Sequence, residues 1–460
     1  MLSRSALSKG VQHAARRSGA VSRRGFAAAA SGSASIPSGS YETADISGLK
    51  VASKDAHGPT TTLAVVAKAG TRYQPLPGLT FGLEQYAFKT TQRRSALRIN
   101  REAELLGGQL TASHTREALV IEASFLRDDL PYFAELLAEV VSQTKYTTHE
   151  FHEEIERILP FKKAAVHADV AGLALDNAHA VAFHNGLGAA LNPSASFPFQ
   201  KYVNEEYISS FADVVYSKPN IAVVADGAGA QNLSKWVDQF FKSVPAAARS
   251  GQTLKSEPTK YYGGEQRTSH PAGNAIVIAF PGSDTAGSKP EIEVLATLLG
   301  GQSTIKWTTG FSLLAKATAG TSGLSASASN QAYSDAGLLT IQLSGAAPSV
   351  RKAAEETVKA LKAIAAGNVS KEDVAKAVAN AKFGLFEKAQ TRGAGVLLAG
   401  TSLVHSGKVQ DLAALAKSLD AVTADKLKTT AKSLLDGKAT VSTVGDLFVL
   451  PYAEELGLRV

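Results

Sequence analysis

Several kinds of residue are absent or scarce in this chain of 460 residues. It contains no cysteine, which excludes disulfide bonds, iron–sulfur clusters held by cysteine and cysteine-based zinc sites. Its ten histidines are scattered, so any metal site would have to use histidine or carboxylate ligands. No apolar run reaches the roughly 18 residues that a membrane-spanning helix needs. We therefore expect any attachment to a membrane to go through other subunits.

Acidic residues are missing from residues 1–40, which carry six of the seven excess positive charges of the chain. The remainder is nearly neutral, so we expect no nucleic acid among the partners. The segment is rich in Arg, Ala and Ser, a composition typical of a mitochondrial transit peptide. Arg24-Gly25-Phe26-Ala27 predicts a processing site after Phe26, followed by a flexible mature terminus at Ser31–Ser40. The alternative interpretation is a disordered basic tail.

The pattern of strands predicts that the chain contains two copies of one unit. The stretch 440–446 matches 222–227, since both are apolar strands that close on glycine. The predicted fold class is α+β, with two homologous units that each pack helices on a mostly antiparallel sheet. The first unit covers 41–244 and the second 271–460, and 245–270 is expected to be a linker. Strands are expected at 49–53, 61–69, 109–113, 118–126, 220–227, 274–282, 323–327, 337–343 and 440–446.

Helices are expected between these strands, and caps and glycines set their ends. The helix that begins near Thr147 contains His149 and His152, a pair that misses the His-Glu-x-x-His spacing by one residue. We interpret this stretch as a solvated helix start, not as a metal site. Phe183–Pro198 is expected to be a loop. Other helices are expected at 101–106, 131–143, 202–211, 236–244, 290–299, 349–366, 371–391, 412–419 and 424–435.

The stretch Pro77–Thr91 predicts a buried helix after a Pro/Gly turn, because apolar residues lie all round it. Phe81, Gln85 and Phe88 would share one face, with Glu84 at its edge. The same spacing serves metallopeptidases with the motif His-x-x-Glu-His, in which two histidines bind zinc beside a glutamate base. Here the two ligand positions hold Phe81 and Gln85, and neither side chain is a suitable zinc ligand.

The flanks of this helix resemble the pitrilysin/insulinase family of metallopeptidases. The resemblance runs from about Leu49 to the C-terminus and implies the two-unit α+β fold on a scaffold descended from a peptidase. Its most specific segments are Ala69–Tyr73, Gly78–Thr80, Phe88–Thr91, Glu104–Ala112 and Ala178–Phe183.

The resemblance also implies where further catalytic residues would lie. The third zinc ligand of the family is a Glu, and counting back from Ala178–Phe183 puts its position at Lys162. The second unit of active relatives supplies an Arg and a Tyr, but the matching positions around Gly323-Leu324 are Ala319 and Ala326. We therefore expect no catalytic residue, no bound metal and no cofactor, with Phe81, Glu84, Gln85 and Lys162 as vestigial positions.

Three functions are compatible with this resemblance. One is a non-catalytic, matrix-facing core subunit of ubiquinol–cytochrome c reductase (respiratory complex III) at the mitochondrial inner membrane. It would pair with a related core subunit and support the membrane subunits. The segments Ala332–Leu338 and Val444–Tyr452 are similar to those core proteins. The second is an active zinc peptidase, which needs ligands that the chain lacks. The third is the presequence-binding, non-catalytic subunit of the matrix processing peptidase, whose long Gly-rich loop is reduced here to two glycines in Leu299–Trp307.

Overall fold

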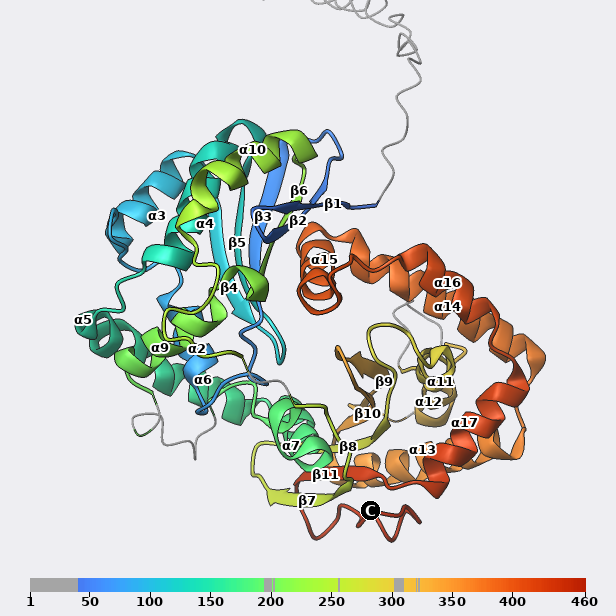
Figure 1. Cartoon of the computed structure of the whole chain (residues 1–460). Coiled ribbons are helices and arrows are strands. Elements are labelled where there is room, and N and C mark those ends of the chain that lie inside the picture. Colours follow the sequence, from blue (N-terminus) through green and yellow to red (C-terminus); the bar gives the residue numbers. More distant parts are fainter. Residues whose placement is uncertain are drawn as a thin grey trace, which may run out of the picture. The chain divides into compact units, whose positions relative to one another are not determined.

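The computed structural model describes residues 40–193, 201, 203–254, 257–301, 310–319, 321 and 323–460. Residues 40–460 form one compact unit, built on two mixed sheets (Figure 1). The predicted transit peptide over 1–40 and its processing site fall outside the described part of the chain, apart from Ser40.

The first sheet has the strand order β1-β2-β6-β3-β5-β4. Its neighbours are antiparallel, except that β2 and β6 run parallel. The central strands are apolar and β-branched, and every residue of β6 is buried. The strands are β1 Glu42–Ile46, β2 Leu49–Lys54, β3 Thr60–Ala67, β4 Gln109–His114, β5 Leu119–Leu126 and β6 Ile221–Asp226.

The second sheet repeats this order without an equivalent of β1. Its order is β7-β11-β8-β10-β9, and β11 pairs in parallel with β7 and antiparallel with β8. Because β6 pairs in the same way with β2 and β3, the expected two-copy α+β fold is confirmed. The strands are β7 Gly264–Ser269, β8 Asn274–Pro281, β9 Ser325–Ala332, β10 Gly337–Gly345 and β11 Thr440–Gly445.

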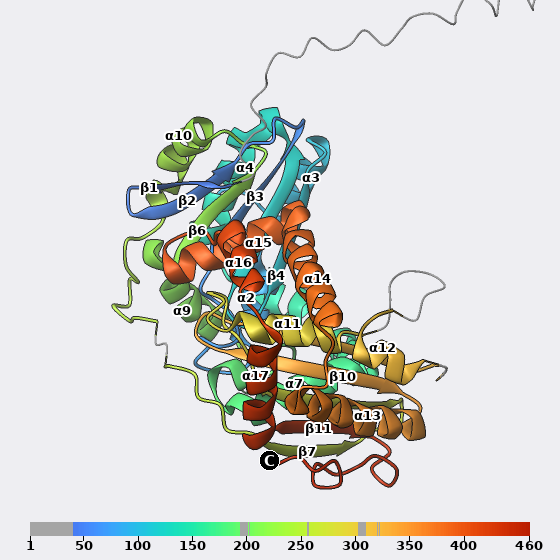
Figure 2. The ribbon, with the colours of Figure 1, turned by 90° about the vertical axis from the view of Figure 1, so that its right-hand side faces the viewer.

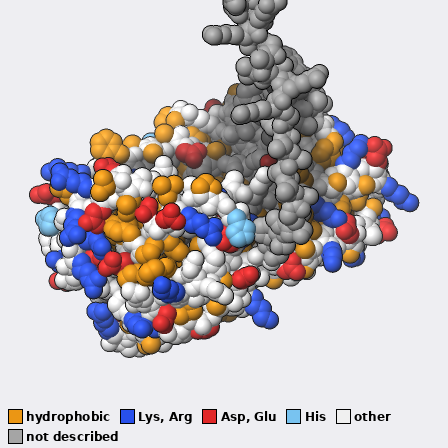
Figure 3. Space-filling model, turned by 90° about the horizontal axis from the view of Figure 1, so that it is seen from above, with side chains coloured by type: hydrophobic (Ala, Val, Ile, Leu, Met, Phe, Trp, Pro, Cys, Tyr) orange, Lys and Arg blue, Asp and Glu red, His pale blue; other side chains and the backbone are white. Residues whose placement is uncertain are grey.

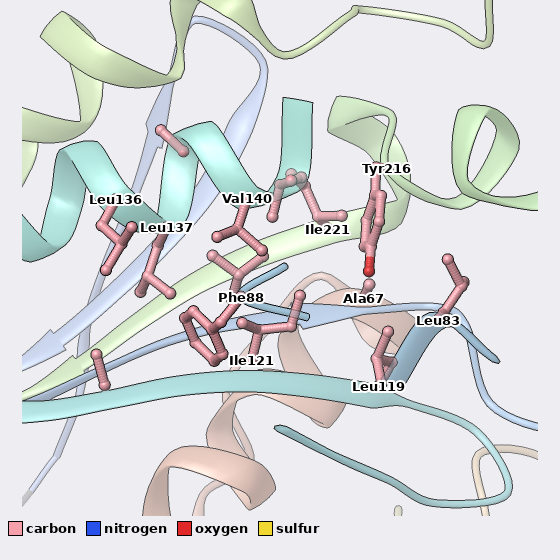
Figure 4. Packing of buried hydrophobic residues seen from close by; sticks show 14 of the residues in the cluster. Ala67, Leu83, Phe88, Leu119, Ile121, Leu136, Leu137, Val140, Tyr216 and Ile221 are labelled. Carbon is pink, nitrogen blue, oxygen red and sulfur yellow. The ribbon is translucent and has the colours of Figure 1, made fainter. Parts of the chain in front are cut away.

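Helices from the first half of the sequence cover one face of the first sheet. Helix α4 supplies Leu136, Leu137 and Val140, which pack toward Phe88 and toward Ile121 of β5 (Figure 4). The helices of this half are α2 Leu79–Tyr86, α3 Ala96–Leu105, α4 Leu130–Gln143, α5 Thr148–Glu150, α6 Glu156–Ala168, α7 Val170–Phe183, α9 Glu205–Val215 and α10 Ala230–Phe240.

Helices α11, α12 and α13 from the second half pack on strands of the second sheet (Figure 2). Helix α13 packs on β8 and β10, with α17 beside it. The helices of this half are α11 Pro290–Leu299, α12 Leu313–Thr318, α13 Ala347–Ala366, α14 Lys371–Gln390, α15 Arg392–Ser406, α16 Leu412–Asp420 and α17 Ala424–Asp436.

Two helices cover the sheet of the opposite half. Ala174, Ala178 and Ala182 of α7 pack on β8 and β11 of the second sheet. In return, Val396, Ala399 and Leu403 of α15 pack on the face of the first sheet opposite to α4. Each sheet is therefore covered on both faces, once by a helix from the other half of the sequence.

Several predicted elements differ from the observed ones. Strand β1 was not expected, and β7 lies within the expected linker 245–270, because pairing with β2 and β11 orders these stretches. The helices expected at 101–106 and 236–244 begin earlier, at Ala96 and Ala230, and α15 was not predicted as a helix. The unit boundaries at 244 and 271 stay a prediction.

The surface carries charges of both signs, which are mixed on the face seen in Figure 3. In the described part of the chain, no helix combines the length and the apolar character needed to span a membrane.

Candidate functional site

Helix α2 carries the motif positions, but it places their side chains in two different surroundings. The side chain of Phe81 is 2 % exposed and belongs to the core beneath the helix, whereas Glu84 and Gln85 line a pocket. The helix ends at Tyr86, and Phe88 follows it with a φ of 61°. The expectation that Phe88 continues the helical face of Gln85 is therefore wrong, because the chain leaves the helix between them.

The pocket beside Glu84 has a volume of about 510 Å³. Its walls come from α2, the turn after it, α3, β4 and the helical segment after α5. The lining side chains are Glu84, Gln85, Ala87, Phe88, Lys89, Ala96, Leu97, Asn100, Leu110, Ala112 and Glu154. No histidine is among them, so the described pocket wall offers carboxylates and amides but no imidazole.

His114, the last residue of β4, holds the carboxyl group of Glu84. Its Nε2 atom lies 2.7 Å from the carbonyl oxygen of Leu191. Because a carbonyl oxygen only accepts, Nε2 must carry a proton. Its Nδ1 atom contacts Oε2 of Glu84, so the imidazole ring bridges this carboxyl group and the backbone near Leu191.

The second oxygen of Glu84 is also engaged, since the side-chain amide of Gln85 donates to it at 3.1 Å. The side chains of His114 and Glu84 are 4 % and 15 % exposed. A general base must be free to take a proton from a bound water. Glu84 is instead one member of a largely buried pair with His114.

The predicted third ligand position lies away from this pocket wall. Lys162 is an exposed residue of α6 and does not line the pocket. The side chain that reaches the pocket from this segment is Glu154, which forms an ion pair with Lys89. The assignment of Lys162 as a vestigial ligand position stays a prediction.

The second half adds no polar group at the positions expected for the Arg and Tyr. Ala326 is a buried residue of β9, and Ala319 directly follows α12. Their methyl side chains cannot donate a hydrogen bond to a developing oxyanion. Gly320 and Ser322, between these positions, lie outside the described residues, as does most of the Leu299–Trp307 segment.

The His149–His152 segment is a helix start, but only part of it is solvated. His149 and His152 are exposed, and Nδ1 of His152 lies 2.7 Å from a carboxylate oxygen of Glu156. Glu150 and Phe151 are buried, and Phe151 begins a turn of π-helix. Across the described residues, no group of three or more His, Cys, Asp or Glu side chains is placed to hold a metal ion.

Sequence reasoning missed His114 and Glu154. His114 was expected in the turn between two strands, whereas β4 extends to include it. Along an edge strand, alternate side chains point to the same face. A histidine in phase with the pocket residues Leu110 and Ala112 is the signal that could have placed it beside Glu84.

Comparisons with known proteins show the family of the chain. Residues 50–193 match the family model described as insulinase (peptidase family M16), and residues 202–381 match the model described as peptidase M16 inactive domain. The chain is similar to "Cytochrome b-c1 complex subunit 2, mitochondrial" of Neurospora crassa, at 59 % identity with all of both chains covered.

Proteins of the same name from other fungi are more distant. The Schizosaccharomyces pombe protein is 37 % identical, with 91 % of this chain and 95 % of the relative covered. The Cryptococcus neoformans protein is 37 % identical, with 94 % and 98 % covered. With its two matched domains and its full-length relatives, this chain belongs to the insulinase family of peptidases (family M16), as the motif around Glu84 implied.

Proposed function

We propose that this chain is a non-catalytic subunit of the cytochrome b-c1 complex (respiratory complex III), equivalent to subunit 2, the core protein 2. The observation that carries the proposal is the 59 % identity over the full length of the Neurospora relative of that name. The site supports the non-catalytic part, because the two motif positions flanking Glu84 hold Phe81 and Gln85. Electron transfer would then belong to other chains of the complex.

The proposal gives the altered site residues no catalytic role. Phe81, Gln85 and Lys162 would occupy the positions of former zinc ligands, and Glu84 that of the former base. The structure supports a structural role for two of them: Phe81 fills the core and Glu84 pairs with His114. A catalytic zinc site needs three protein ligands and an open position for water.

The proposed partners are a related core subunit, which would form a heterodimer with this chain, and the membrane subunits of the complex. The proposed place is the matrix side of the mitochondrial inner membrane. The mitochondrial names of the relatives and the acid-free basic N-terminus support it. Contact with the membrane would pass through other subunits.

The alternative, the presequence-binding subunit of the matrix processing peptidase, is not favoured. The relatives compared above carry the b-c1 name over nearly their whole length.

Blue-native electrophoresis of mitochondria tests the proposal. An antibody against this chain should detect it in the band that contains cytochromes b and c1, and the two cytochromes should co-purify with it. As a control, the purified complex should be assayed for cleavage of a presequence peptide with and without a zinc chelator. The proposal is wrong if the chain migrates instead with a soluble zinc-dependent peptidase subunit.

A further inference from the structure

The apolar cores divide the described chain into two lobes that differ from the two halves of the sequence. Lobe one contains the first sheet with α2 to α6, α9, α10 and α15, and lobe two contains the second sheet with α7, α11 to α14, α16 and α17. Four clusters of buried apolar residues make up the cores, and each lies within a single lobe. The apolar packing therefore stabilises each lobe but does not join one to the other.

Packing between elements of different lobes is mainly between helices that are consecutive in the chain. These pairs are α6 with α7 and α14 with α15. Interfaces between domains permit relative motion unless they are large and hydrophobic. The orientation of the lobes must therefore depend on something other than a shared apolar core.

Arg72 joins the lobes by polar contacts. Its guanidinium donates to both carboxylate oxygens of Asp335, each at 2.6 Å, and to Glu117 at 2.8 Å. It also donates to Ser334 at 3.3 Å and to the backbone carbonyl oxygen of Glu257 at 3.0 Å. Arg72 and Glu117 belong to lobe one, whereas Ser334 and Asp335 form the tip between β9 and β10 of lobe two.

Neighbouring residues extend this polar contact. Glu117 accepts from the backbone N–H of Ser334 at 2.9 Å and from its hydroxyl at 2.6 Å. Arg116 of lobe one forms an ion pair with Asp176 of α7 and donates to the carbonyl oxygen of Leu187 at 3.1 Å. We call this set the joint: Arg72, Arg116, Glu117, Asp176, Ser334 and Asp335.

The two charged side chains that lobe one contributes at the centre of the joint are buried. The side chains of Arg72 and Glu117 are 5 % and 9 % exposed. A bidentate pair between guanidinium and carboxylate fixes direction as well as distance, and here it joins the buried Arg72 to Asp335, whose side chain is 33 % exposed. Directional contacts of this kind constrain how the two surfaces meet, in contrast to apolar contact, which is non-directional.

We propose that the joint, with Arg72 as its central positioning residue, sets the orientation of the two lobes and keeps them from swinging against each other. The tip between β9 and β10 holds the lobes together through its contacts with Arg72 and Glu117. Thr259, in the segment before β7, donates to the same Asp335 from its backbone N–H and from its hydroxyl, both at 3.0 Å. This inference is independent of the complex in which the chain is proposed to work.

A distance measurement between spin labels tests the proposal in the full chain. Since the chain has no cysteine, the changes Arg101→Cys on α3 and Lys432→Cys on α17 place one label on each lobe at exposed positions. With the joint intact, the distance distribution should have one narrow peak. Adding Asp335→Asn and Ser334→Ala should broaden it, or shift its mean by more than its original width.

Asp55→Asn is the matched control. Asp55 forms a bidentate pair with Arg127 that lies wholly within lobe one, so losing it should leave the distance distribution unchanged. Circular dichroism should show that all variants are folded. The proposal is overturned if the intact joint already gives a broad distribution, if the Asp335 and Ser334 changes leave it narrow and unshifted, or if Asp55→Asn broadens it equally.

Discussion

At the scale of single residues, the helix that carries Glu84 shows motif positions whose side chains serve the packing of the fold. Phe81 fills the core where a ligand would have to face the pocket, and His114 pairs with Glu84. The absence of histidine at positions 81 and 85 is visible in the sequence because the motif is local. The pairing with His114 could not, because it joins residues from a helix and a strand that only tertiary packing brings together.

Restoring the two histidines should not restore a peptidase. With Phe81→His and Gln85→His, we expect weak zinc binding and no presequence cleavage, since Glu84 stays paired with His114 and the Glu154 carboxylate that reaches the pocket is held in an ion pair with Lys89. An imidazole in place of a buried phenyl ring should also lower the free energy of unfolding by roughly 2–4 kcal/mol. The measurements are zinc content and cleavage by the purified variant with its natural partner.

Gln85→His alone serves as the control for this double variant. Its position lines the pocket, so it should cost much less stability than the change at Phe81. Zinc-dependent peptide cleavage by the double variant, above the wild-type background, would contradict the expectation that the restored site is inactive.

His179 should make the stability of the protein depend on pH. Burial, with a further contribution from Arg116, lowers the pKa of His179 to about 3. Its Nδ1–H donates to Leu175 at 2.8 Å, and its Nε2 accepts from the hydroxyl of Tyr333 at 2.7 Å. The unfolded chain has a histidine pKa near 6.5, so it binds a proton more readily than the folded chain between pH 6.5 and 3. This group therefore favours unfolding increasingly as the pH falls below 6.5.

The variant His179→Gln tests this linkage by urea unfolding at pH 7 and pH 5. The wild-type protein should lose about 2 kcal/mol more than the variant over this interval, although the variant is less stable at pH 7. His149→Gln, at an exposed histidine, should behave like the wild type. Equal losses for His179→Gln and the wild type would contradict the assignment of a buried neutral imidazole.

At the scale of elements, the helices and strands with a clear apolar period were predicted, and those defined by tertiary contact were not. β1 is almost wholly exposed, so its sequence carries no pattern of alternate burial. α15 contains several glycines, which lower helix propensity. These glycines make the helix hard to predict from the sequence, but as small residues they allow it to lie close to β3.

Gly400 on α15 should be intolerant of a side chain. A Cβ atom at this position would lie 2.3 Å from Cγ2 of Val66 on β3. We expect Gly400→Ala to lower the free energy of unfolding by about 1–3 kcal/mol through overpacking. Thermal unfolding of the variant measures this.

Gly384→Ala is the matched control on the neighbouring helix α14. A Cβ there meets nothing within 4 Å, so alanine should stabilise the helix by up to about 1 kcal/mol. Equal stability of the two alanine variants would contradict the close contact between α15 and the first sheet.

At the scale of the whole molecule, the repeat of one α+β unit could be predicted. The packing of α7 and α15 on the sheet of the opposite half could not. Strand β6 ends directly before Gly227 and the matching strand β11 ends at Gly445, so both close on a glycine that is visible in the sequence. Whether an apolar helix covers its own sheet or the other one leaves no trace in periodicity, because α7 and α15 would present similar small residues to either. The polar joint at Arg72 was unpredictable for the same reason, since its members are spread from residue 72 to residue 335.

Processing of the N-terminus is the last prediction. The basic, acid-free segment and Arg24-Gly25-Phe26 predict cleavage between Phe26 and Ser31. Such a cut removes no residue of the folded unit, because the first strand begins at Glu42. N-terminal sequencing of the protein from mitochondria should give a start within this interval. Arg24→Ala should impair cleavage while Arg16→Ala leaves the site unchanged, and a mature chain that still begins at Met1 would refute the prediction.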